Sequence, residues 1–117
     1  MVNVSLGAND NERTVLKLIR AMELGILDQS IDELCSSEFI WANSGLPTIY
    51  GLEQLRGHMA SGGFSNDIPI LKKMTHFSAE LLNLASDKDI VFTERLDHHW
   101  DESGRDLMTP HICGVSK

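Results

Sequence analysis

Apolar residues recur at helical spacing near the start of the chain and form one stripe. Its members are Val15, Leu18, Ile19 and Met22. This spacing predicts an amphipathic helix. Asn9 or Asp10 can cap its beginning, because their side-chain oxygens can accept hydrogen bonds from the free amides of the first turn. Gly25 is the predicted end of this helix.

Two shorter helices are predicted further along. Ser30-Ile31-Asp32-Glu33 has the pattern of a capping box, which predicts a helix from Ser30 with Leu34 on its buried side. Gly51 precedes a third helix, which Gly62-Gly63 ends. The apolar face of the third helix is formed by Leu52, Leu55 and Met59.

Between the second and third helices, and again after the third, the pattern is that of strands. Phe39–Asn43 and Thr48–Tyr50 flank a turn that contains Gly45 and Pro47. From residue 68 the apolar period changes to two, which predicts three long strands. These are 68–85 with a break near Lys72-Lys73, 90–100 and 105–115. Helices followed by an antiparallel meander indicate the α+β class. We expect a single domain over residues 1–117, with the polar residues 1–9 frayed.

Composition narrows the function classes. The 117 residues carry a net charge of −7, which argues against binding to nucleic acid. No apolar run has the length of about 18 residues that a membrane helix needs, and the N-terminus does not resemble a secretory signal. Cys35 and Cys113 lack the spacing of a zinc site, and we predict reduced thiols in a cytoplasmic protein without a metal.

The strand over residues 90–100 carries the most informative side chains. Alternate residues of a strand share a face, so Arg95, Asp97 and His99 project from the same surface as Val91 and Thr93. If that surface is the concave one under the helices, an acid and a guanidinium lie together inside a pocket. The alternative is an ordinary ion pair on a solvated face.

Trp41 and Asn43 repeat this arrangement on the first strand. Residues i and i+2 share a face, so an indole N–H and an amide point the same way and can hold a water or a ligand oxygen. The alternative is that Trp41 belongs to the core and Asn43 begins a turn.

These residues resemble a known family. The string Val91-Phe92-Thr93-Glu94-Arg95-Leu96-Asp97, followed by a turn with Gly104, by Pro110 and by Gly114-Val115, resembles the limonene-1,2-epoxide hydrolases of the NTF2-like (SnoaL-like) superfamily. The segment 41–47, followed by Gly51 and a helix, is similar to the first strand and third helix of that family. The resemblance covers about residues 8–115.

The resemblance implies a cone: a strongly curved sheet around a deep apolar pocket that helices close. It also implies that Asp97 gives a proton to an epoxide oxygen, that Arg95 orients Asp97, and that Asn43 holds the attacking water. Trp41 stands where the family has Tyr and donates a hydrogen bond but accepts poorly. The expected substrate-binding residues are Trp41, His99, Met74, Leu107 and Met59. No cofactor is implied.

The family's second Asp, which takes the proton of water, lies on a last strand beyond the segment that Gly114-Val115 resembles. His99 or His111 are the residues that could replace it. The missing final strand is expected to leave strand edges unpaired and to open one side of the pocket. We therefore predict a homo-oligomer in which another copy, or a shifted terminal segment, covers the gap.

The sequence is compatible with three functions. The chain is an epoxide-hydrolase-like enzyme for a small apolar epoxide, or a non-catalytic member of the same fold that binds a small apolar ligand or serves in assembly. The third is a truncated reading frame of a hydrolase, in which case about one strand of added sequence restores activity.

Overall fold

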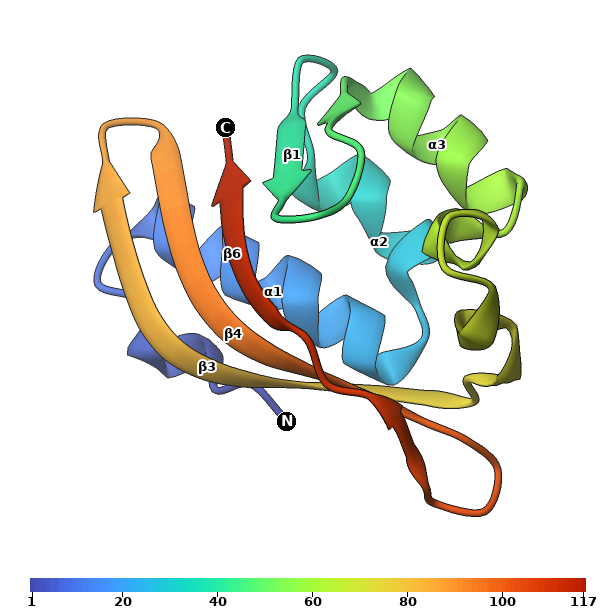
Figure 1. The fold of residues 1–117 in the computed structure, drawn as a ribbon. Coiled ribbons are helices and arrows are strands. Elements are labelled where there is room, and N and C mark those ends of the chain that lie inside the picture. Colours follow the sequence, from blue (N-terminus) through green and yellow to red (C-terminus); the bar gives the residue numbers. More distant parts are fainter.

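The computed structural model describes residues 1–117 and has helices packed on one side of a curved sheet (Figure 1). The α-helices are α1 (Asp10–Leu24), α2 (Leu27–Leu34) and α3 (Leu52–Ala60). The predicted limits of α1 are confirmed. Asn9 caps it by accepting from the amide of Glu12 at 2.9 Å, and Gly25 ends it in the left-handed conformation at φ 71°.

The second helix begins earlier than predicted. It starts at Leu27, and its N-cap is Ile26, which makes no side-chain hydrogen bond there. Ser30 lies inside the helix, where its hydroxyl donates to the carbonyl of Ile26 at 2.9 Å. The predicted capping box is therefore wrong, because the hydroxyl bonds back to the preceding turn.

The segment after α3 also differs from the prediction of a strand from residue 68. Short 3-10 helices cover Gly63–Asn66 (η2) and Pro69–Lys73 (η3), and the strand begins only at His76. Pro69 stands in the first turn of η3, where its missing amide and fixed φ are tolerated. Residues of η2 and η3 line the space between α3 and the sheet.

The sheet has six antiparallel strands in the order β2-β1-β6-β4-β3, with β5 paired to β4 off this path. The strands are β1 (Ile40–Asn43), β2 (Ile49–Tyr50), β3 (His76–Asp87), β4 (Ile90–Trp100), β5 (Asp106–Met108) and β6 (His111–Ser116). The α+β class and the antiparallel meander are confirmed.

The last strand, β6, lies inside the sheet, between β4 and β1. β6 pairs with β4 from Leu96↔His111 to Val91↔Ser116, and with β1 from Trp41↔Ser116 to Asn43↔Gly114. Figure 1 shows β6 between these two neighbours. The expectation of unpaired edges at this point is therefore wrong, because the short terminal strand occupies the place between β4 and β1.

Two apolar clusters hold the helices on the sheet. One joins α1 to β3 and β4 through residues that include Leu16, Phe77 and Val91. The other joins the opposite side of α1, through Leu18, to α2, α3, β1 and β2. Residues 1–9, which we expected to fray, contain a 3-10 helix, η1 (Val4–Leu6), and Val2 is 5% exposed within the first cluster. The amide of Val2 donates to the buried carboxylate of Glu23 at 2.8 Å, which fixes this segment against α1.

Candidate functional site

The concave face of β4 carries a row of buried polar side chains. Burial alternates along the strand, and Arg95 (3% exposed), Asp97 (6%) and His99 (9%) all lie on the buried face with Val91 and Thr93. The prediction that these residues share one face is confirmed. The alternative of a solvated ion pair is excluded, because both members are covered by protein.

Arg95 is the centre of this cluster. Its Nε donates to Oδ1 of Asp97 at 3.0 Å and its Nη2 donates to Oδ2 at 3.0 Å, which makes a bidentate salt bridge. Nη2 also donates to Oδ1 of Asn43 at 2.9 Å, and Nη1 donates to the hydroxyl of Thr93 at 2.6 Å. The planar guanidinium thus joins β1 to β4 across β6 and fixes the orientation of Asp97.

Gly114 makes room for the guanidinium. A Cβ at this position of β6 would lie 2.6 Å from Nη1 of Arg95, 2.8 Å from Oγ1 of Thr93 and 2.9 Å from Oδ1 of Asn43. No side chain fits there without moving the cluster. The glycine is needed for this close approach, because the three polar atoms converge over its Cα.

The cluster faces a cavity of about 1240 Å³ between the sheet and α2, α3 and the 3-10 turns. Asn43, Arg95 and Asp97 line it, and so do four of the five residues expected to contact a ligand: Trp41, Met59, Met74 and His99. The remaining wall is largely apolar. The space therefore suits a small apolar molecule that presents a polar group to the Arg95 cluster.

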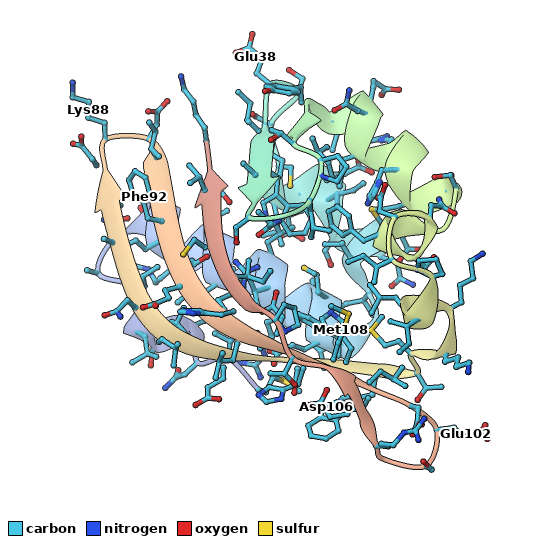
Figure 2. The ribbon with its side chains drawn as sticks, in the orientation of Figure 1. Glu38, Lys88, Phe92, Glu102, Asp106 and Met108 are labelled. Atoms are coloured by element: carbon cyan, nitrogen blue, oxygen red, sulfur yellow. The ribbon has the colours of Figure 1, made fainter.

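Leu107 does not line the cavity, so the prediction that it contacts a ligand there is wrong. A bulge explains this, because β4 pairs His99 with Met108 and Trp100 with Asp106, leaving Leu107 as the extra residue. Met108 takes the cavity position instead. Figure 2 shows Met108 on the side of the helices and Asp106 on the other side of the ribbon.

His99 and Trp41 line the cavity with their rings. Nδ1 of His99 lies 3.1 Å from the carbonyl oxygen of Met108, and the His99 ring lies 5.4 Å from that of Phe77. A carbonyl only accepts, so Nδ1 carries the proton in this contact. The Trp41 ring is 3% exposed and contacts Phe39 and Phe64, at centroid distances of 6.5 and 6.3 Å.

The outer face of β4 carries a second set of polar residues. His98 lies 3.0 Å from a carboxylate oxygen of Asp106, and that contact, together with a weaker one to Glu80, raises the pKa of His98. His111 lies 2.6 Å from Glu94. A hydrogen bond from Asn83, and then the contact with His111, lowers the pKa of Glu94. His111 pairs with Glu94 and does not line the cavity.

Sequence reasoning missed three contributors to the site. Thr93 was on the expected face but had no assigned role, and Gly114 was only part of a resemblance. Arg56 of α3, which pairs with Asp32 of α2, lies at the cavity wall. The cross-strand register would have revealed the first two, since Thr93 pairs directly with Gly114. The pairing of α2 with α3 has no local signal.

Other chemistry has less support in the structure. No group of three or more His, Cys, Asp or Glu side chains is arranged to hold a metal ion. Both cysteines are free, and burial raises the pKa of the Cys35 thiol to about 11, which keeps it protonated and unreactive. None of the helices combines the length and the apolar character that crossing a bilayer requires.

No protein-family model matches the chain, and no curated protein matches it.

Proposed function

We propose that this protein is an NTF2-like hydrolase that adds water to a small apolar epoxide. The observation that carries the proposal is the buried Arg95–Asp97 pair with Asn43 at the wall of a largely apolar cavity. A buried ion pair contributes little net stability relative to apolar residues, so its presence in a cavity wall favours a role in chemistry. The resemblance to the limonene-1,2-epoxide hydrolases supplies the reaction class.

Each member of the cluster has a part in the proposed reaction. Asp97 is the proton donor to the epoxide oxygen. In its ionised form both of its oxygens accept from Arg95, so protonation of one oxygen opens one of these bonds while the other still holds the carboxyl group. Asn43 uses its oxygen for Arg95, which leaves its NH2 group to hold water.

The test is diol formation from limonene oxide or styrene oxide. We expect turnover by the native chain, and loss of at least about 100-fold in the Asp97→Asn variant, since a positioned acid contributes at least that factor. Circular dichroism and ligand-dependent thermal shifts show whether the variant still folds and binds. No turnover above the Asp97→Asn background would contradict the enzyme.

A second candidate is a non-catalytic binding protein with the same cavity. It is favoured by the fact that Arg95 contacts a single carboxylate, so that the cluster is complete without a second acid to activate water. This candidate predicts that apolar epoxides and related cyclic molecules raise the melting temperature of the native chain without being converted.

We also propose that the protein forms a homo-oligomer, with the edge of the sheet covered by another copy. With β6 paired on both sides, the remaining long edge is that of β3, which pairs only with β4. Gel filtration tests this. A clean monomer at low micromolar concentration contradicts the proposal, and its outcome is independent of the hydrolase assay.

A further inference from the structure

We infer that His99 is the general base of the proposed hydrolase, taking the proton of the attacking water on Nε2. The inference rests on the proposed function, in which Arg95 holds no second carboxylate that could take this proton. A general base needs an unprotonated atom within hydrogen-bond reach of a water beside the substrate. His99 has the right tautomer, opens onto the cavity and lies beside Asp97.

The tautomer of the neutral ring follows from the contact with Met108. Nδ1 donates to the Met108 carbonyl oxygen at 3.1 Å, so the neutral ring keeps its lone pair on Nε2. The ring of Phe77, the cross-strand partner of His99, lies 5.4 Å from the imidazole ring. A backbone carbonyl that orients the imidazole in this way plays the part that a buried carboxylate plays in many catalytic histidines.

Access follows from the position of the ring. His99 lines the cavity, and Nε2 neither has a hydrogen-bond partner in the protein nor is among its enclosed, unpartnered polar atoms. A water in the cavity can therefore reach it. His58 also lines the cavity, but its Nε2 is enclosed without a partner. The other three histidines, His76, His98 and His111, do not line the cavity.

His99 also lies beside Asp97, the proposed acid. Asp97 and His99 stand two residues apart on the same face of β4, so their side chains project side by side with Cα atoms about 7 Å apart. A small epoxide lying across this pair presents its oxygen to Asp97 and a ring carbon to the water beside His99. The two remaining carboxylates at the wall, Asp28 and Asp32, come from α2 across the cavity, and Asp32 is paired with Arg56.

In the proposed step Asp97 gives up one proton and His99 takes up one. The lone pair of water forms a bond to a ring carbon, and the carbon–oxygen bond of the epoxide breaks with its electrons passing to the oxygen. That oxygen takes the proton of Asp97, and the proton of water passes to Nε2 of His99. The product is a diol, with Asp97 a carboxylate and His99 an imidazolium. Transfer of one proton from Nε2 to Asp97, through cavity water, restores the starting state.

The experiment compares His99→Gln with His98→Gln, its neighbour on the outer face of the same strand. With limonene oxide, we expect His99→Gln to lower kcat about 100-fold or more, with KM changed by less than about threefold. We expect His98→Gln to leave both constants near those of the native chain. Imidazole added to a His99→Gly variant should restore part of the turnover, which a merely structural role would not allow. Nitrogen-15 NMR of the native chain should report a proton on Nδ1 of His99.

The outcomes separate the two proposals. Native turnover that survives in His99→Gln overturns the role of His99 and leaves the hydrolase standing, as does an NMR spectrum with the proton on Nε2. If the native chain forms no more diol than Asp97→Asn, both proposals fall. If His99→Gln does not fold, the imidazole rescue of His99→Gly and the NMR tautomer decide the question.

Discussion

The two faces of β4 carry similar residues in opposite surroundings. On the concave face Arg95 and Asp97 form a salt bridge whose side chains are 4% and 9% exposed. On the outer face, His98 with Asp106 and His111 with Glu94 form pairs whose side chains are 24% to 56% exposed. Burial, and not residue type, decides what each pair does. The inner pair cannot lose a member without leaving a charge in the protein interior, whereas water replaces a lost partner on the outer face.

The largest expected effect is that of removing the inner acid. Asp97→Ala leaves the Arg95 guanidinium buried without a carboxylate, which we expect to lower the free energy of unfolding by about 3–5 kcal/mol. Urea unfolding of the two proteins measures this. The matched control is Asp106→Ala on the outer face, which we expect to change stability far less. Equal effects of the two substitutions would break the distinction between the faces.

The next effect concerns the space that the inner cluster needs. Gly114→Ala puts a methyl group 2.6 Å from Nη1 of Arg95, and we expect a loss of about 1–3 kcal/mol in the free energy of unfolding as the cluster shifts. The same assay measures it, and the polar contacts of Asn43 and Thr93 should change with it. A native-like stability would mean that the guanidinium has room to move.

Gly57→Ala is the control for Gly114→Ala. Gly57 lies inside α3, and a Cβ there has nothing within 4 Å. Alanine in a helix interior is more favourable than glycine by about 0.5–1 kcal/mol, so this substitution should stabilise the protein. The same chemical change is thus expected to have opposite signs at the two positions.

Which residues of β4 share a face was visible in the sequence, because alternation in a strand is a local property, but which of the two faces is buried was left open. The period of two along Ile90–Trp100 put Arg95, Asp97 and His99 on one face. The limits of the first helix were predicted from the capping residue at its start and from Gly25 at its end. The fold class followed from the order of the elements. The resemblance to a family added the expectation of a pocket, which composition alone would not have supplied.

What sequence reasoning missed depends on contacts between distant residues. Met108 lines the cavity in place of Leu107 because of a bulge in the pairing of β5 with β4. No local pattern of the sequence reveals which strand residue lacks a partner. β6 fills the place between β4 and β1 through backbone pairing, which has no side-chain signature. Ser30 matched a capping pattern but bonds to the carbonyl of Ile26, because the helix had already begun. In each case tertiary context decides between local alternatives.

The smallest expected effect comes from the outer face and appears as a pH dependence. The hydrogen bond with Asp106, and then that with Glu80, raises the pKa of His98 above its ordinary value, and Trp100 stacks on the His98 ring. Protonated His98 therefore stabilises the folded state. This contribution is complete below the unfolded pKa of about 6.5 and is lost as the pH rises through the higher folded pKa.

His98→Gln should remove this contribution. We expect the difference in unfolding free energy between the native chain and the variant to shrink between about pH 6 and pH 8, by about 1 kcal/mol or less. Groups common to both proteins, the inner pair included, cancel in this difference. A lowered pKa of Asp106 adds stability that is lost only as the pH falls through its folded value, so that acid contribution lies outside the interval. A difference that grows with pH would have the wrong sign and would mean that His98 is held neutral.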